Sequence, residues 1–256
     1  MKKRGSYRWL LWILLAVVLI GVALWNLLVP AFDRWRSAQE YDELAASYVD
    51  AGDPVDEDWW ATAVNVDFAK LQAENPEVIG WIRFDDQQAL GINYPVLYSG
   101  DNNKYLRTDL HGNAHIAGSI FLEGLNKPDF SDYYNIIYGH NMTDGTMFSG
   151  LAKYKELAFW QAQPYFTVYT PETAYRYQIF SCEEVVNGSD VYQIGYQPGD
   201  TYQQFIDRMV RESLIQTGLH PQSTNKLLTL STCKDDGGEH RFTVHAVCID
   251  AVMMEK

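Results

Sequence analysis

The sequence predicts a mostly β domain, either a barrel or a sandwich, preceded by one long N-terminal helix. Short segments rich in Tyr, Ile, Val and Phe recur after residue 78, and turns containing Gly, Asn and Asp separate them. An unbroken apolar run near the N-terminus predicts the helix. Because 47% of the 256 residues are hydrophobic, the chain can form a sizeable core and is too apolar for disorder.

The apolar run is the first predicted element, a membrane anchor. From Trp9 to Val29 every residue is apolar or glycine except Asn26, and at about 1.5 Å per residue the run is as long as one bilayer core is thick. It is too long for the apolar part of a cleaved signal peptide. Basic residues crowd its N-terminal side, which predicts a cytoplasmic tail over residues 1–8 and an extracytoplasmic location for everything after Pro30.

Residues 30–60 are predicted to form a helical and acidic stalk. Tyr41, Leu44 and Tyr48 have helical spacing, and Gly52-Asp53-Pro54 ends that pattern. The chain therefore divides into a tail (1–8), a transmembrane anchor (9–29), a stalk (30–60) and an extracytoplasmic domain (61–256).

Within that domain the elements follow in a regular order. Asp67 is expected to cap a short helix that ends near Glu74, and one amphipathic helix is expected at 201–216, stopped by Gly218. The predicted strands are 78–84, 94–98, 119–122, 135–138, 165–169, 175–186, 226–232 and 241–249.

Charge and cysteine content exclude some functions. The formal net charge is −13, from 33 acidic and 20 basic residues, so the chain offers no basic face for nucleic acid. Cys182, Cys233 and Cys248 are an odd number, so at least one is not in an intramolecular disulfide. Cys182 and Cys248 are predicted to be buried strand thiols, and they could pair only if their strands were neighbours.

The last two strands bring together two groups that could do chemistry. Cys233 ends one strand and Arg241 opens the next, so an antiparallel hairpin would set their backbones about 5 to 8 Å apart. A guanidinium near the sulfur favours the nucleophilic thiolate and can hold an oxyanion, which suits acyl transfer. The spacing alone favours the simpler interpretation, a buried thiol and an arginine in a surface ion pair, and does not decide between the two.

A cysteine nucleophile also needs a proton carrier, and six histidines are available. His140 follows an apolar run at a predicted strand end, where a side chain can project into a cleft. His111 and His115 flank a turn, and His245 lies inside a strand as a hydrogen-bonded structural histidine. His140 is therefore the preferred candidate.

Two blocks carry a resemblance to a known family. Residues 136–154, IIYGHNMTDGTMFSGLAKY, resemble the histidine block of the class B sortases, which are membrane-anchored cysteine transpeptidases of Gram-positive bacteria. Residues 228–246, LTLSTCKDDGGEHRFTVHA, resemble the cysteine and arginine blocks of that family. Weaker similarity begins near residue 66 and includes VIGWIRF, YPVLYSGDNNKYL and GSIFLE in the expected order.

The resemblance implies a fold and a set of roles. The fold would be a closed β-barrel with N-terminal helices and a helix before the cysteine strand. Cys233 would be the nucleophile, His140 the general acid and then base, and Arg241 the stabiliser of the developing oxyanion. The resemblance also implies weaker substrate-binding roles, which fall on Ser231, the Lys234 backbone N–H and Asp235.

The implied reaction joins two substrates. Cys233 would cleave a C-terminal sorting motif of a secreted protein after its threonine, forming a thioester, and an amine of the peptidoglycan cross-bridge or of lipid II would resolve it. Water would be the slower competitor. No cofactor and no metal are expected, because the calcium site known in sortases belongs to a different class.

The sequence alone leaves three other functions open. An L,D-transpeptidase also uses His, Cys and Arg, although that family carries a Ser-x-Gly-Cys element that Ser231-Thr232-Cys233 lacks. A membrane-tethered binding module could retain the barrel with an inert site. A metal site could be built from Cys233, His240 and His245.

Overall fold

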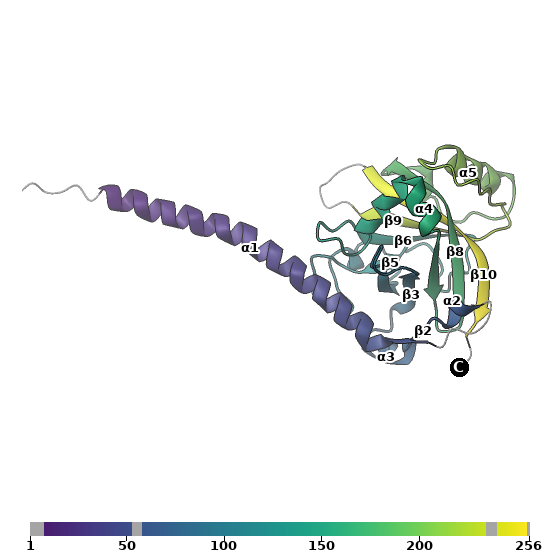
Figure 1. The fold of residues 1–256 in the computed structure, drawn as a ribbon, viewed down its shortest axis with the longest axis horizontal. Helices are drawn as coiled ribbons and strands as arrows, with labels where there is room; N and C mark the ends of the chain where they lie inside the picture. The colour runs from purple at the N-terminus through teal and green to yellow at the C-terminus, as the bar shows by residue number, and fades with distance from the viewer. Residues whose placement is uncertain (1–7, 53–57, 234–239, 255–256) are drawn as a thin grey trace, which may run out of the picture.

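Eight strands close into a barrel in the computed structural model, which describes residues 8–52, 58–233 and 240–254 (Figure 1). Their order around the barrel is β10-β8-β7-β3-β4-β5-β6-β9. The bounds are β3 Val78–Phe84, β4 Asn93–Leu97, β5 Ile120–Leu122, β6 Tyr134–His140, β7 Tyr165–Tyr169, β8 Thr173–Val186, β9 Leu227–Cys233 and β10 His240–Met253. The predicted closed barrel is confirmed, and the sandwich alternative is wrong.

Two of the strand pairs are parallel and matter for the site. β4 pairs with β5, and β6 pairs with β9, while the other neighbours around the barrel are antiparallel. Parallel strands need a long connection, and the chain between β6 and β9 contains β7 and β8. As a result the C-terminal ends of β6 and β9 meet at one end of the barrel.

The N-terminal helix α1 runs from Arg8 to Tyr48 without a break at Pro30. It is the one helix of the described residues that is long and apolar enough to cross a membrane. Figure 1 shows its N-terminal part extending away from the barrel. Its last turns pack on the domain, because Tyr41 and Tyr48 are buried there. The structure therefore has one helix where the sequence suggested a span followed by a separate stalk helix.

Short elements connect α1 to the barrel. β1 (Val49–Ala51) pairs with β2 (Val64–Val66), α2 covers Trp59–Thr62, and α3 covers Phe68–Glu74. The predicted cap is confirmed, since the Asp67 side chain accepts a hydrogen bond of 2.9 Å from the Lys70 backbone N–H.

The connection between β8 and β9 carries the predicted amphipathic helix. η3 spans Asp190–Tyr192, and α5 spans Asp200–Arg211 rather than 201–216. The helix ends early because β8 offers other partners: the Leu214 N–H donates to the Cys182 carbonyl at 2.8 Å, and the Cys182 N–H donates to Ser213 Oγ at 3.2 Å. The remaining short helices are η1 Lys104–Leu106, η2 Ser149–Lys155 and α4 Leu157–Ala162.

Side chains alternate between the two faces of β6, β9 and β10. One set lies in the barrel core, and it includes Ile137, Leu228, Leu230, Val244 and Ala246. The alternate set faces outward and packs in part under α5, with Tyr134, Ile136, Leu227 and Val247 in an aromatic-rich cluster. The candidate site lies on this outer face, because residues two apart on a strand share a face.

Candidate active site

The strand register brings two of the predicted residues side by side. In the parallel pair of β6 and β9, His140 is the Cα partner of Cys233, and each is the last residue of its strand. These residues are 93 positions apart in the chain, and they become neighbours because both strands point toward the same end of the barrel.

β10 brings the third residue to the same place. In the antiparallel pair of β9 and β10 the register runs from Val247 opposite Leu227 to Thr243 opposite Ser231, two residues before Arg241 and Cys233. The strands stay together up to this point, because Thr232 Oγ1 accepts from the Phe242 N–H at 3.1 Å and lies 3.2 Å from the Phe242 carbonyl. His140 and Cys233 thus occupy adjacent positions on neighbouring strands, and Arg241 of β10 lies near the end of β9.

His140 is held in a defined orientation. His140 is 3% exposed, and Nε2 of its ring lies 2.7 Å from the Leu106 carbonyl oxygen. A carbonyl oxygen can only accept, so Nε2 carries a hydrogen, and in the neutral ring Nδ1 is then the basic nitrogen. The Leu106 carbonyl therefore selects the tautomer that can exchange a proton at Nδ1.

The position of Leu106 depends on a close backbone approach. Gly118 has a φ of 54°, and a Cβ there would lie 2.6 Å from the Leu106 carbonyl oxygen. Only glycine fits both constraints. The Gly118 carbonyl accepts a hydrogen bond from the Tyr41 hydroxyl of α1, so the loop that orients His140 is also attached to the N-terminal helix.

Arg241 is oriented by the turn that follows β8. Its Nε donates to Asn187 Oδ1 at 3.1 Å, and its Nη1 lies 3.5 Å from the carbonyl oxygen of Thr232, the residue before Cys233. The guanidinium is thus directed along the end of β9.

Ser231 lies on the outer face of β9, two residues before Cys233. Its Oγ is 3.1 Å from the hydroxyl of Tyr192 in η3. Tyr192 stacks on Tyr138 of β6 with ring centroids 6.3 Å apart, and the Tyr138 hydroxyl donates to Glu123 at 2.7 Å. Sequence reasoning missed Tyr138 and Tyr192 as part of this site, because nothing local shows which strand η3 covers. The predicted residues Lys234 and Asp235 lie outside the described residues.

The other cysteines have the environment of unreactive thiols. Cys182 is buried in the barrel core and Cys248 is partly buried, and both are free. Although β8 and β10 are neighbours, Cys182 lies opposite Val244 and Cys248 opposite Tyr177, so the two cysteines are not partners. Burial raises the pKa of Cys182 to about 12 and that of Cys248 to about 11. Both thiols therefore stay protonated near neutral pH.

His245 has a structural role, and its position also bears on the metal alternative. His245 is buried and hydrogen-bonded to Thr229 and Glu183, as predicted for a structural histidine. His240 and His245 are five residues apart on β10 and so face opposite sides of the strand. This argues against the metal alternative, and within the described ranges no three His, Cys, Asp or Glu side chains form a metal-ligating group.

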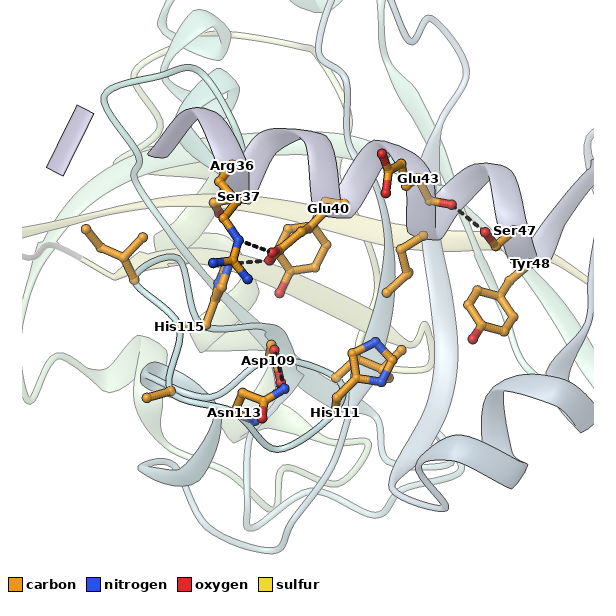
Figure 2. Close-up of a pocket in the computed structure, with 15 residues that line it drawn as sticks. Arg36, Ser37, Glu40, Glu43, Ser47, Tyr48, Asp109, His111, Asn113 and His115 are labelled. Atoms are coloured by element: carbon orange, nitrogen blue, oxygen red, sulfur yellow. Dashed lines mark hydrogen bonds and ion pairs between the residues drawn. The ribbon is translucent and has the colours of Figure 1, made fainter. Parts of the chain in front are cut away.

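One hollow among the described residues lies away from this site. It has a volume of about 630 Å³ and lies between α1 and the loop of residues 109–116 (Figure 2). Its walls mix apolar side chains with charged and titratable ones, namely Arg36, Glu40 and Glu43 from the helix and His111 and His115 from the loop. It contains none of the predicted site residues, so it is a hollow of the helix–barrel junction.

Comparison with known proteins identifies the family of this chain. Residues 88–249 match the family model described as the sortase domain. The chain is 30% identical over 228 residues to sortase B of Listeria monocytogenes, which covers 86% of this chain and 88% of that protein. The crystal structure of sortase B from Bacillus anthracis in complex with AAEK1 matches with a TM-score of 0.70 at 28% identity, covering 86% of this chain and 99% of that one.

A further solved structure adds a ligand-bound relative. A sortase B complexed with triglycine matches with a TM-score of 0.67 at 27% identity and covers 74% of this chain and 86% of that one. The fold and the family model define the class: the chain belongs to the sortase family of cell-wall transpeptidases. Within that family it is a class B sortase, as the resemblance of its two sequence blocks indicated.

Proposed function

We propose that this sortase works by a cysteine mechanism, cleaving a C-terminal sorting motif after its threonine and joining the secreted protein to a peptidoglycan amine. The register of β6 and β9, with His140 opposite Cys233, is the observation that carries the proposal. A nucleophile needs a proton carrier within reach, and adjacent strand positions provide that proximity.

The first stage forms a thioester. The Cys233 thiolate attacks the threonine carbonyl carbon, and the developing oxyanion is stabilised by Arg241, whose guanidinium cannot lose its proton. The C–N bond breaks, and His140 gives its Nδ1 proton to the leaving amine. The Leu106 carbonyl supports this assignment because it engages Nε2 in both protonation states.

The second stage reverses these proton movements. His140, now neutral, accepts a proton at Nδ1 from the incoming amine as that amine attacks the thioester. The new amide forms and Cys233 leaves as thiolate. A relative complexed with triglycine supports a glycine-type or other wall amine as acceptor. Ser231, the Lys234 backbone N–H and Asp235 are proposed to contact the sorting peptide.

The proposed location follows from α1. Its apolar part would anchor the chain in the cell membrane, with residues 1–8 cytoplasmic and the barrel outside, next to the wall. The partners would then be secreted proteins with a C-terminal sorting signal and the peptidoglycan cross-bridge or lipid II amine.

The test uses the full chain in detergent with Asn-Pro-x-Thr-type and Ser/Pro-Pro-x-Thr-type peptides and triglycine. We expect a triglycine adduct and, without triglycine, an acyl-enzyme mass on Cys233. Cys233→Ala should abolish both products, whereas the matched control Cys248→Ala should retain them. Turnover by Cys233→Ala would contradict the proposal, and so would cleavage confined to wall tetrapeptides, which would favour the L,D-transpeptidase alternative.

A further inference from the structure

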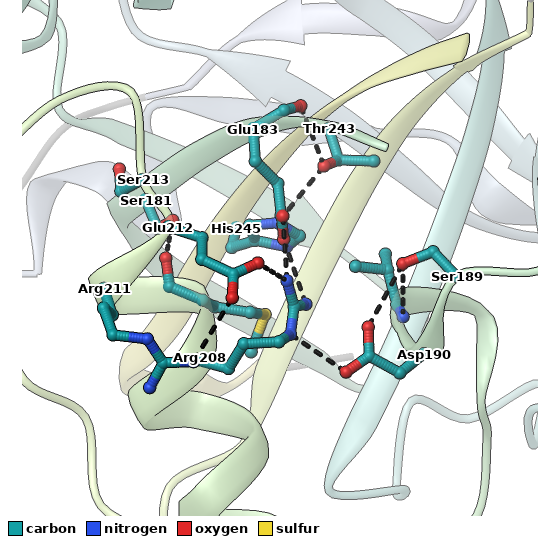
Figure 3. Close-up of polar contacts among 12 residues, drawn as sticks. Ser181, Glu183, Ser189, Asp190, Arg208, Arg211, Glu212, Ser213, Thr243 and His245 are labelled. Carbon is teal, nitrogen blue, oxygen red and sulfur yellow. Dashed lines mark hydrogen bonds and ion pairs between the residues drawn. The ribbon is translucent and has the colours of Figure 1, made fainter. Parts of the chain in front are cut away.

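A buried charge cluster lies on the outer face of the barrel, below the connection that carries η3 and α5 (Figure 3). It consists of Glu183 on β8, Arg208 on α5 and His245 on β10. Arg208 Nη1 donates to Glu183 Oε2 at 2.9 Å and Nη2 donates to Oε1 at 3.1 Å, which is the two-pronged geometry that fixes orientation as well as distance. The Glu183 side chain is 6% exposed, so water does not weaken these contacts.

The directions of the hydrogen bonds determine the charge of His245. The Tyr134 hydroxyl donates to the Val191 carbonyl at 2.8 Å, so its oxygen accepts from Thr229, 2.9 Å away. With its only hydrogen used, Thr229 Oγ1 must accept from His245 Nδ1 at 2.8 Å.

The second ring nitrogen faces acceptors as well. His245 Nε2 lies 3.0 Å from Glu183 Oε1 and 3.2 Å from Thr243 Oγ1, whose own hydrogen goes to the Glu183 carbonyl at 3.2 Å. Both nitrogens therefore carry hydrogens, and His245 is an imidazolium beside a carboxylate. Glu183 thus holds one cation from α5 and one from β10.

Together with the hydroxyls of Thr229 and Tyr134, the cluster forms a continuous chain of polar contacts, and both ends of this chain reach η3. One end reaches η3 through the Val191 carbonyl. The other end reaches it through Arg208, whose Nε forms an ion pair of 2.9 Å with Asp190. Figure 3 shows the Arg208 guanidinium between Glu183 and Asp190. Tyr192, which follows Val191 in η3, is the residue whose hydroxyl contacts Ser231.

We propose that Glu183, Arg208, His245, Thr229 and Tyr134 form a positioning network that holds η3 over β9 and thereby sets the affinity for the peptide substrate. The inference rests on the proposed function, in which the peptide passes Ser231 to reach Cys233. None of the five residues needs to touch the reacting atoms. Loosening the network should therefore weaken substrate binding and leave the chemical step unchanged.

The test removes single hydroxyls from the network. In the full chain in detergent, Thr229→Val cuts the link between His245 and Tyr134, and Tyr134→Phe cuts the link to Val191. For an Asn-Pro-x-Thr-type peptide with triglycine we expect each variant to raise KM roughly 3- to 10-fold, the size of one hydrogen bond. The kcat and the rate of Cys233 alkylation by iodoacetamide should stay within about twofold of the unaltered chain.

A matched control separates this role from general stability. Thr167 on β7 is a buried threonine that accepts from a buried arginine, Arg176 Nη1, at 2.9 Å. Thr167→Val should leave KM unchanged. The double variant, with Thr229→Val and Tyr134→Phe, should raise KM no more than the single variant that has the larger effect. Both hydroxyls belong to one series of hydrogen bonds, so breaking it twice adds nothing.

Three results would overturn the inference. They are an unchanged KM in both variants, an equal rise in Thr167→Val, or a fall in kcat with KM constant. Failure of the unaltered chain to form any acyl-enzyme would instead contradict the proposed function, so the two failures are distinguishable.

Discussion

The inner and outer faces of β6, β9 and β10 differ in chemistry although they belong to the same three strands. The inner face is mostly apolar and buried, as at Leu230 and Val244. The outer face carries His140, Ser231 and Arg241. Alternation along a strand separates the two sets by one residue. The same three strands can therefore carry a reactive site on one face while the side chains of the other face stabilise the barrel.

The largest effect is expected on the inner face. Leu230→Ala removes buried methyl groups from the barrel core and should lower the free energy of unfolding by about 2 to 5 kcal/mol. The adjacent outer-face change Ser231→Ala is the matched control, and it should change KM with a much smaller effect on stability. Urea unfolding and peptide kinetics on both variants provide the measurement. Equal losses of stability would remove the distinction between the faces.

The second-largest effect is expected on activity and not on stability, when Arg241 is replaced. Arg241→Lys should reduce kcat roughly 10²- to 10³-fold, about 3 to 4 kcal/mol of transition-state stabilisation, because an ammonium cannot reproduce the guanidinium fork. The free energy of unfolding should change by less than about 0.5 kcal/mol, since the residue is only partly buried and the lysine keeps the positive charge. Turnover like that of the unaltered chain would remove Arg241 from the mechanism.

A third prediction concerns acid stability of the outer face. Burial alone would raise the pKa of Glu183, but hydrogen bonds and charge from His245 and Arg208 outweigh it and lower that pKa to about 2. The stabilisation is therefore complete above the unfolded pKa near 4.5 and is lost as pH falls toward 2. It amounts to about 3 kcal/mol.

The measurement is urea unfolding between pH 7 and pH 2. The curve of Glu183→Gln should be flatter than that of the unaltered chain below about pH 4.5. Asp85→Asn, which alters the ion pair between the buried Arg176 and the partly buried Asp85, is the control for the loss of a carboxylate that pairs with an arginine. Parallel curves for Glu183→Gln and the unaltered chain would contradict the prediction.

The smallest effect is expected at Gly139, the residue before His140 on β6. A Cβ on Gly139 would lie 2.7 Å from the ring of Phe148 and also too close to Ile120. Gly139→Ala should therefore cost about 1 to 3 kcal/mol of unfolding free energy through overpacking. Thermal unfolding measures this cost. An unchanged Tm would show that the core has room at this position.

Local patterns predicted most of the fold. The strand at 165–169 and the helix capped by Asp67 occur as expected, because alternating β-type segments and a capping carboxylate are local signals. The end of α5 was predicted five residues too late, since Ser213 and Leu214 bond to β8 instead of continuing the helix. The continuity of α1 through Pro30 was likewise not predicted.

The sequence by itself determined the kinds of groups available: a thiol at a strand tip, a guanidinium at the next strand, a histidine after an apolar run, and an apolar segment of membrane length. Only the tertiary structure decided that β6 lies parallel to β9, that Leu106 orients His140, and that Tyr192 reaches Ser231. Each of these contacts joins segments far apart in the chain. They depend on how strands close into a barrel, which no local pattern of side chains specifies.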